Sequence, residues 1–307
     1  MSNVKAIKKI DIHCHAVLFR EYFPTYYPED PNSAFVSPEH VLEYHEKLGI
    51  DKGILLPIAS PEGQLSPIPS EECKYITTKY PEHFYWFCNV DPRAEANTTT
   101  TDLCRLLRHY IALGAKGLGE LTSHLDADDP QLDNLFSACE ECDLPVIIHI
   151  SPNHDDGYGI CDEIGLPRLE KVLKKHPNLK IIGHSQPFWA EIDGGLTEEI
   201  RGTYPQGKVV EGGRLIELLR KYDNLYCDLS AGSGSNAMMR DPEFTQKFFE
   251  EFADRIMYGC DICLPGQTFP FKFRDFLDQM LDEGKISEEN YRKIARENAI
   301  RILKLDA

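Results

Sequence analysis

The sequence lacks the features that mark a membrane or exported protein. No uninterrupted apolar run is long enough to cross a lipid bilayer, and the opening residues, MSNVKAIKKI, lack the apolar core of a signal peptide. Ten cysteines are scattered among the expected strands and helices, which indicates free thiols in a reducing compartment and not a disulfide framework. We therefore expect a cytoplasmic protein that makes no contact with a membrane.

Positive charge is also scarce. The 33 lysine and arginine residues face 50 aspartate and glutamate residues, so the formal charge is -17. This balance disfavours a broad surface for nucleic-acid phosphates, although it leaves room for a local pocket that binds a small anion. No linker or low-complexity stretch divides the chain, and 42% of its residues are hydrophobic, as in ordinary globular proteins. We expect residues 1–307 to form a single domain.

Short apolar runs alternate with segments of helical pattern along the whole chain. Most runs are continuous, as is typical of parallel strands covered on both faces. The eight expected strands are KKIDIHC from Lys8, KGILLPIA from Lys52, FYWFCNV from Phe84, AKGLGEL from Ala115, PVIIHI from Pro145, LKIIGHS from Leu179, NLYCDLS from Asn224 and RIMYGCD from Arg255. Eight strand-helix units in a chain of this length predict an α/β fold, a (β/α)₈ TIM barrel.

Three local patterns give further expectations. The run SAGSGSNAMMR, which ends at Arg240, contains two glycines and is expected as a flexible loop. The segment SEENYRKIARENAIRIL from Ser287 is expected as one closing helix. Two Cys-x-x-Cys pairs, at residues 139 and 142 and at residues 260 and 263, have no accompanying pair and are expected as buried thiols.

Metal-binding residue types stand where the strands are expected to end. His13 and His15 end the first strand, and residues two apart on a strand share a face. The other candidates end later strands: Glu120, His149, His184 and Asp261. Because the carboxyl ends of barrel strands converge in space, these side chains would meet, and burying them without partners would be costly. The pattern predicts a divalent metal site at the carboxyl ends of the strands.

These motifs resemble the amidohydrolase superfamily of TIM-barrel enzymes. The resemblance extends from Asp11 to Leu305 through DIHCH, GELTSH, VIIHI, IIGHS and YGCDICLP. The segments LPRLEKVLKKHPNLKIIGHS and KIARENAIRIL are similar to the amidohydrolase-related (amidohydrolase 2) branch, which holds both hydrolases and nonoxidative decarboxylases of aromatic or unsaturated acids. The resemblance implies one or two divalent ions, with zinc as the first choice and manganese as the second. It also implies a homodimer or a larger homo-oligomer.

The resemblance assigns roles to the candidate residues. It implies that the ion is bound by His13, His15, His149 and Asp261. His184 would bind a second ion or polarise the substrate, and Glu120 would either bridge two ions or be a salt-bridged barrel residue. Asp261 and His184 are the candidate catalytic residues, with Asp261 exchanging a proton with water and His184 steadying an oxyanion.

The reaction expected from this ligand set is hydrolysis. A divalent ion lowers the pKa of bound water, and the resulting hydroxide would attack an amide, lactone or ester bond of a small molecule. The turn after His184 reads HSQPFW where the decarboxylase branch usually shows HxGG, so nonoxidative decarboxylation of an aromatic or unsaturated acid ranks second. A TatD-like nuclease, favoured by Glu120 but not by the net charge, ranks third. A barrel that only binds a ligand ranks last.

Four residues are candidates for binding the substrate. Arg20 and Tyr26 belong to the aromatic segment AVLFREYFPTYYPED, which would wall a pocket or else form a packed lid or a subunit contact. Trp189 follows His184 closely, and Arg240 ends the glycine-containing run after the seventh strand.

Overall fold

The computed structural model of the protein describes residues 7–62, 66–155 and 157–306. Its strands are β1 (Lys9–Cys14), β2 (Ile50–Leu55), β3 (Phe84–Trp86), β4 (Leu118–Leu121), β5 (Val146–Ser151), β6 (Ile160–Cys161), β7 (Ile181–His184), β8 (Leu225–Asp228) and β9 (Ile256–Met257). All of their ladders are parallel, in the orders β1-β2-β3 and β4-β5-β7-β8-β9, while the short β6 pairs with β5.

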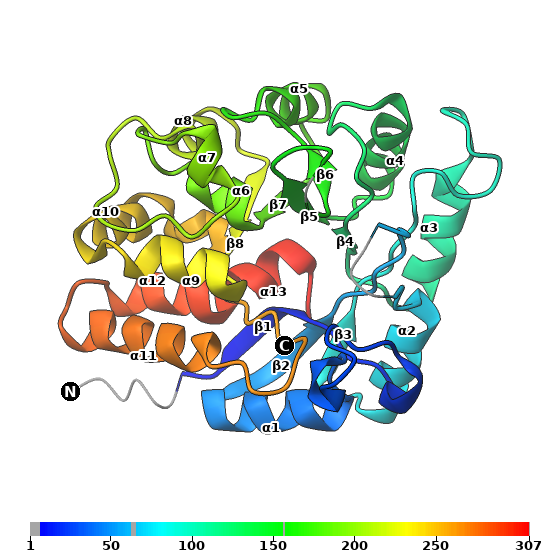
Figure 1. The fold of residues 1–307 in the computed structure, drawn as a ribbon, viewed down its shortest axis with the longest axis horizontal. Helices are drawn as coiled ribbons and strands as arrows, with labels where there is room; N and C mark the ends of the chain where they lie inside the picture. The colour runs from blue at the N-terminus through cyan, green and yellow to red at the C-terminus, as the bar shows by residue number, and fades with distance from the viewer. Residues whose placement is uncertain (1–6, 63–65, 156, 307) are drawn as a thin grey trace.

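Two isolated bridges close these ladders into a barrel. Cys88, just after β3, pairs with Leu118 of β4, and Cys14 of β1 pairs with Ile262, just after β9. Figure 1 shows the strands surrounded by a ring of helices. Within the described residues eight strands therefore form the barrel, and β6 is an addition in the loop after β5. The predicted (β/α)₈ TIM barrel is confirmed.

The helices follow the strands in the expected alternation. They are α1 (Pro38–Leu48), α2 (Ser70–Lys79), α3 (Leu103–Ala112), α4 (Pro130–Glu141), α5 (Pro167–Lys175), α6 (Gln186–Ala190), α7 (Glu198–Arg201), α8 (Arg214–Lys221), α9 (Ala231–Met239), α10 (Pro242–Phe252), α11 (Phe269–Asp282), α12 (Glu288–Arg292) and α13 (Asn298–Leu303). Short 3₁₀ turns are η2 (Arg20–Tyr22), η3 (Pro31–Ser33) and η4 (Ala253–Arg255), and η5 (Lys293–Glu297) is a π-helical turn.

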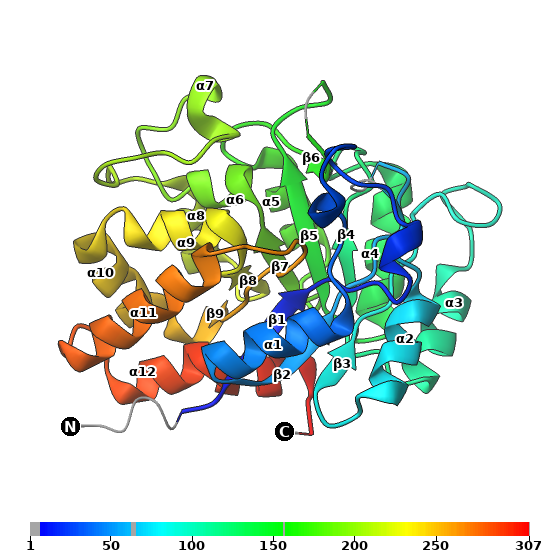
Figure 2. The same ribbon diagram turned by 60° about the horizontal axis from the view of Figure 1, so that its bottom comes forward.

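An apolar cluster fills the interior of the barrel and closes one end of it. It takes side chains from the strands and, among the helices, from α13: Ile10, Ile12, Ile54, Leu56, Phe87, Ile147, Ile182, Tyr226, Met257, Ala299, Ile302, Leu303 and Leu305. A larger apolar cluster lies between the strands and the surrounding helices. Figure 2 shows α12 at one end of the molecule and β6 with α7 at the opposite end. The carboxyl ends of the strands point toward β6 and α7. The apolar cluster does not close this end of the barrel, so polar side chains can gather there.

Strand β1 has an irregular register that matters for the site. Between Asp11 and Cys14 it carries one residue more than the facing stretch of β2. Such a bulge changes the alternation of side chains along a strand. Ile12 accordingly packs in the barrel interior, while its neighbour His13 also points inward, toward the carboxyl end. Cys14 lies in the outer cluster, away from both neighbouring histidines, as the alternation beyond the bulge predicts.

Two sequence expectations about elements were wrong. The run after β8 is the helix α9 and not a flexible loop, because contacts with α6, α10 and α11 outweigh the low helix propensity of its two glycines. Gly234 suits this packing, since a Cβ there would lie 2.4 Å from the backbone oxygen of Leu229. The closing segment is not one regular helix, because the π-helical turn η5 separates α12 from α13.

Two further expectations concern membranes and cysteines. Among the residues that the structure describes, no helix combines the length and the apolarity needed to cross a bilayer. All ten cysteines are free thiols. Cys139 and Cys260 are buried, and their partners in the Cys-x-x-Cys pairs, Cys142 and Cys263, are half-buried.

Candidate metal centre

Two imidazoles of β1 turn their Nε2 atoms toward each other. Nδ1 of His13 donates to Asp228 Oδ2 at 2.7 Å, and Nδ1 of His15 donates to the backbone oxygen of Leu56 at 2.9 Å. Because a carboxylate and a carbonyl only accept, these contacts leave the lone pairs of both rings on Nε2. The two Nε2 atoms lie 3.1 Å apart. Two facing acceptors of this kind need a cation, a metal ion or a proton, between or beside them.

Glu120 of β4 and Asp261 complete this set of donors. Glu120 Oε2 lies 3.6 Å from His13 Nε2 and 3.4 Å from His15 Nε2. Asp261 Oδ1 lies 3.6 Å and 3.7 Å from the same two nitrogens. Ligands of one tetrahedral ion with bonds near 2.1 Å stand roughly 3.4 Å apart. Each carboxylate therefore stands at the distance from the two imidazoles that ligands of a divalent ion would have, and the ligand atoms of His13, His15 and Asp261 all lie within 4.8 Å of one another.

The second oxygen of Glu120 faces the other two predicted histidines. Oε1 accepts from His149 Nδ1 at 2.5 Å and lies 3.9 Å from His184 Nε2. Glu120 thus stands between two groups of imidazoles, with His13 and His15 at one oxygen and the other pair at the second. The structure brings all six predicted site residues together, and this placement of Glu120 is compatible with one ion or with two.

Asp228, at the end of β8, is a residue of this site that the sequence analysis missed. Its Oδ2 contacts His13 Nδ1 at 2.7 Å and His184 Nδ1 at 3.1 Å, and accepts from the Ser230 hydroxyl at 2.6 Å. It orients two imidazoles from the side away from Glu120. The signal was available, because DLS ends the seventh expected strand in the way that the histidines end theirs. Gly259 gives this carboxylate room, since a Cβ there would lie 2.5 Å from Asp228 Oδ1.

The electrostatics of the buried groups favour a cation. Burial would raise the pKa of Glu120, but the imidazoles of His149 and His13 hold it well below its usual range. Burial also works against ionisation of Asp228, yet His13 keeps the pKa of this carboxyl low. Burial would lower the pKa of His13, but the carboxylates of Asp261 and Asp228 raise it well above its usual value. The field that attracts a proton to His13 would equally attract a metal ion.

Asp261 is the carboxylate that solvent can reach. Its side chain is 20% exposed, against 4% for Glu120 and none for Asp228. Its backbone nitrogen donates to the oxygen of His13 at 2.7 Å, which fixes the residue in a left-handed conformation with φ of 53°. Burial raises the pKa of this carboxyl, against the opposing effect of His13 and His15. A substrate that enters the site would therefore meet Asp261 first.

Aromatic side chains lie close to the imidazoles of the site and to this carboxylate. The Tyr158 ring lies 4.2 Å from the His149 ring, centroid to centroid, and Phe35 lies 6.1 Å from His15. Burial raises the pKa of Tyr26, and the nearby carboxylates of Asp261 and Glu120 add to this effect. Arg20 lies at the same end of the barrel, where its Nε donates to the backbone oxygen of Phe35 at 2.9 Å.

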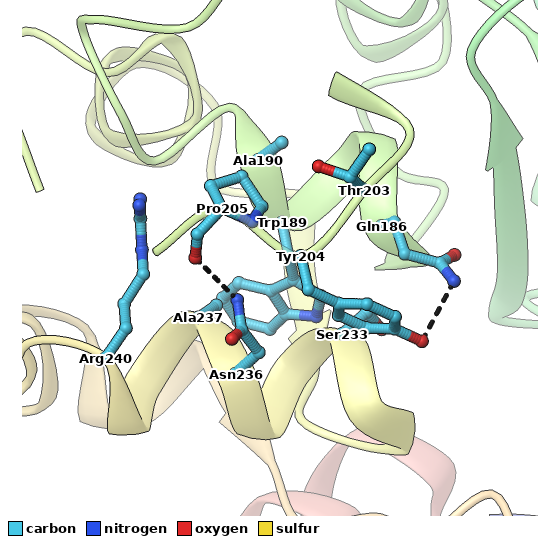
Figure 3. A pocket seen from close by; sticks show the side chains of 10 residues that line it. All are labelled: Gln186, Trp189, Ala190, Thr203, Tyr204, Pro205, Ser233, Asn236, Ala237 and Arg240. Carbon is cyan, nitrogen blue, oxygen red and sulfur yellow. Dashed lines mark hydrogen bonds between the residues drawn. The ribbon is translucent and has the colours of Figure 1, made fainter. Parts of the chain in front are cut away.

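The other two predicted substrate-binding residues lie elsewhere. Trp189 and Arg240 line a small cavity between α6, α9 and the segment after α7, together with Gln186 and Tyr204 (Figure 3). The Trp189 indole donates to the backbone oxygen of Asp228 at 2.9 Å, and Arg240 pairs with Asp193 at 2.8 Å. Both side chains are buried in these contacts. Trp189 therefore touches the backbone that carries Asp228 and not the metal-facing side of the site.

The fold and the site together define a class of protein. A TIM barrel with imidazoles and carboxylates converging at the carboxyl ends of its strands is the architecture of metal-dependent barrel enzymes. A family model described as Amidohydrolase matches residues 10–305, and the chain belongs to this family, amidohydrolase 2. Membership makes the protein a metal-dependent hydrolase or decarboxylase and confirms the resemblance seen in the sequence. No curated protein matches the sequence.

Solved structures share the fold along the whole chain. A 5-carboxyvanillate decarboxylase from Novosphingobium aromaticivorans, complexed with manganese and 4-hydroxy-3-methoxy-5-nitrobenzoic acid, is 18% identical, with 98% of this chain and 97% of that chain covered and a TM-score of 0.60. A 2,6-dihydroxybenzoate decarboxylase from Rhizobium is 19% identical over 98% and 99%, with a TM-score of 0.59. A probable 2-pyrone-4,6-dicarboxylic acid hydrolase from Acinetobacter baumannii is 13% identical over 97% and 100%, also with a TM-score of 0.59. At such identities the likeness shows the fold.

Proposed function

We propose that the protein is a metal-dependent, nonoxidative decarboxylase of a small aromatic carboxylic acid. The observation that carries the proposal is the presence of two tyrosines, Tyr26 and Tyr158, near the accessible carboxylate Asp261 and the donors of the candidate metal centre. Aromatic side chains beside a polar centre are typical of sites that bind a planar aromatic acid. Structural relatives that are decarboxylases of aromatic acids, among them the two described above, support the same reaction. The proposal reverses the preference for hydrolysis that the sequence suggested.

In this proposal His13, His15, Glu120 and Asp261 hold the ion, with His149 beside Glu120. Manganese and zinc both suit nitrogen and oxygen donors, and the manganese-containing relative favours manganese. A divalent ion bound there would supply positive charge that holds an anionic substrate and stabilises charge developing on it. We further infer that residues 1–307 act as one unit, because the site draws on strands from β1 to the end of β9.

The proposed proton donor is Asp261. When the bond between the ring and the carboxylate breaks, the electron pair stays on the ring carbon and carbon dioxide leaves. The carbon then takes a proton, which Asp261 would deliver from its solvent-facing side chain. His184, held by Asp228 and Ser230, would fix the orientation of the substrate rather than exchange a proton with it.

The test measures decarboxylation and hydrolysis with the same preparation of the protein. Protein loaded with manganese or with zinc is incubated with hydroxylated benzoates carrying a labelled carboxylate, and in parallel with aromatic lactones, esters and amides. We expect labelled carbon dioxide from at least one acid, and no release from the variant Asp261→Asn. Asp223→Asn, at a fully exposed aspartate, is the matched control and should keep wild-type activity. Opening of a lactone or amide without any release of carbon dioxide would refute the proposal.

Hydrolysis is the second candidate, and one observation favours it. The two oxygens of Glu120 face separate pairs of imidazoles, as a carboxylate that bridges two ions would. Two bridged ions activate a water molecule for attack. Metal analysis of the active protein distinguishes the cases: one ion per active chain agrees with decarboxylation as proposed, and two ions together with lactone or amide cleavage would establish the hydrolase.

A further inference from the structure

A second group of ligand-type side chains lies on the rim of the barrel, outside the metal centre. His124 follows β4, His154 follows β5, and Cys161 ends the short strand β6. One ligand atom from each of these residues lies within 4.8 Å of one from each of the others. Figure 2 shows β6 at the end of the molecule where the strands carry the site. None of the three belongs to the donor sets around Glu120.

The backbone fixes the distance between two of the three residues. Asp126 and Cys161 form a parallel bridge, in which Cys161 N donates to Leu125 O at 2.7 Å and Ala127 N donates to Cys161 O at 2.9 Å. His124 is therefore held beside β6 by hydrogen bonds that involve no side chain of the group. Its Nδ1 lies 3.9 Å from Cys161 Sγ. Two ligands of one tetrahedral zinc ion, one nitrogen and one sulfur, stand roughly 3.6 Å apart.

Hydrogen bonds also set the tautomers of both imidazoles. Nε2 of His124 donates to the backbone oxygen of His154 at 3.1 Å, and Nε2 of His154 donates to Asp126 Oδ1 at 2.8 Å. Since a carbonyl and a carboxylate accept, Nδ1 carries the lone pair in each ring. The pairing of a carboxylate with the distal nitrogen of His154 is the arrangement that orients metal-binding histidines in many proteins. The thiol of Cys161 lies 3.6 Å from the backbone oxygen of Asn153 and also interacts with the Ser151 side chain.

We propose that His124, His154 and Cys161 bind a second kind of metal ion, a divalent transition metal of the zinc type, as a clip between the loops that follow β4 and β5. A thiolate with two imidazoles selects zinc or cobalt over manganese, which prefers oxygen donors. Binding displaces the Cys161 proton to solvent, and a water molecule completes a tetrahedral shell. The clip ties down the loop between β5 and β6, which also carries Tyr158 beside the metal centre.

Cobalt titration tests this site separately from the metal centre. The protein is first loaded with manganese and then titrated with cobalt(II), whose bond to a thiolate gives a charge-transfer band in the near ultraviolet. The proposed donors of the metal centre contain no sulfur, so the band reports the rim site. We expect the band in the wild-type protein and one additional equivalent of bound metal. Cys161→Ser should abolish the band, and Cys142→Ser, at a half-buried cysteine outside this group, should keep it.

A second variant controls for misfolding, which could also abolish the cobalt band. The side chain of His154 is 57% exposed, so His154→Ala should leave the barrel intact and weaken cobalt binding at the rim at least tenfold. Manganese content should stay at the wild-type level in both rim variants. Absence of the band from the wild-type protein would overturn the proposal, and so would its persistence in Cys161→Ser or an unchanged cobalt affinity in His154→Ala.

Discussion

Asp228 shows how one buried carboxylate can order several imidazoles. A single oxygen contacts the Nδ1 atoms of His13 and His184 and the hydroxyl of Ser230. Since Nδ1 of His13 is occupied in this way, its Nε2 must face Glu120 and Asp261. Orientation of the ligand ring, and not direct contact with an ion, is the role that the geometry supports.

Replacement of Asp228 by asparagine should therefore weaken metal binding. The asparagine amide keeps the size of the side chain but has a single acceptor oxygen. In the wild-type protein His13, His184 and Ser230 contact a carboxylate at this position. We expect about a 10–100-fold loss of affinity, measured by competition with a chromogenic chelator. Asp223→Asn is the control, because Asp223 is fully exposed. Unchanged affinity in a correctly folded Asp228→Asn protein would contradict a positioning role.

A pH-dependent contribution to stability is expected from Arg93. Its guanidinium pairs with Glu62 at 2.5 Å and with Asp91 at 2.7 Å, on the loops after β2 and β3. Burial would raise the pKa of Asp91, but Arg93 lowers it, and Arg93 also lowers the pKa of Glu62. Carboxyls with a depressed folded-state pKa contribute stability above their unfolded values, near about 4, and lose it as the pH falls.

Arg93→Met should accordingly destabilise the protein by up to about 1 kcal/mol at neutral pH, with a difference that shrinks as the pH falls below about 4. Urea unfolding at neutral and at acid pH measures this effect. Arg108→Met, which removes an exposed ion pair with Glu141, should change stability less at every pH. A loss from Arg93→Met that stays constant with pH would show that packing, and not charge, accounts for it.

At the scale of elements, the bulge in β1 decides where the first two ligands point. A regular strand would place His13 on the face opposite Ile12, outside the barrel. The extra residue between Asp11 and Cys14 allows an apolar residue and the adjacent histidine both to face inward. A spacing of two predicts that His13 and His15 share a face. It does not say which face, because the sequence carries no signal for the register shift.

The helix α13 is expected to stabilise the barrel through its interior contacts. Ile302 is buried in the cluster that fills the barrel, whereas Glu297, one turn earlier, is exposed. Ile302→Ala should cost about 2–5 kcal/mol, because the loss of three buried methyl or methylene groups opens a cavity among side chains from several strands. Glu297→Ala should stay within about 0.5 kcal/mol. Chemical denaturation measures both, and a loss below about 1 kcal/mol for Ile302→Ala would contradict the closing role of α13.

Patterns of residues predicted the elements well where burial dictates the sequence. The eight barrel strands are continuous apolar runs because both faces of each strand are covered, and this signal survives in a single sequence. The helix α9 escaped prediction because its neighbours α6, α10 and α11 stabilise it against the preference of Gly232 and Gly234. Tertiary packing of this kind leaves no local trace in the sequence.

At the scale of the whole molecule, the candidate metal centre joins segments from opposite sides of the barrel. Its expected donors come from β1, β4 and the segment after β9, so an ion would link strands that no single ladder connects. Six candidate residues could be predicted because each ends a strand, and barrel strand ends converge. Asp228 was missed, since an aspartate at a strand end is less distinctive than a histidine. The placement of Trp189 and Arg240 could not be inferred, because loop paths depend on packing.

Removal of metal should lower the stability of the entire protein. An ion that binds the folded chain alone stabilises it by about 2.7 kcal/mol when its free concentration is a hundredfold above the dissociation constant. We expect treatment with EDTA to lower the melting temperature and re-addition of manganese or zinc to restore it. The variant His15→Ala, which lacks one expected donor, should respond less to both treatments. An unchanged melting temperature after verified loss of metal would contradict this expectation.

The hydrogen bond from Asp261 N to His13 O joins the beginning of the chain to a residue near its end. During synthesis on the ribosome, the two histidines of β1 emerge first and Asp261 follows only after all nine described strands and most of the helices. A nascent chain therefore presents an incomplete set of donors for most of its elongation. Full coordination becomes available only as the barrel closes, which makes tight metal uptake a late event and a marker of completed folding.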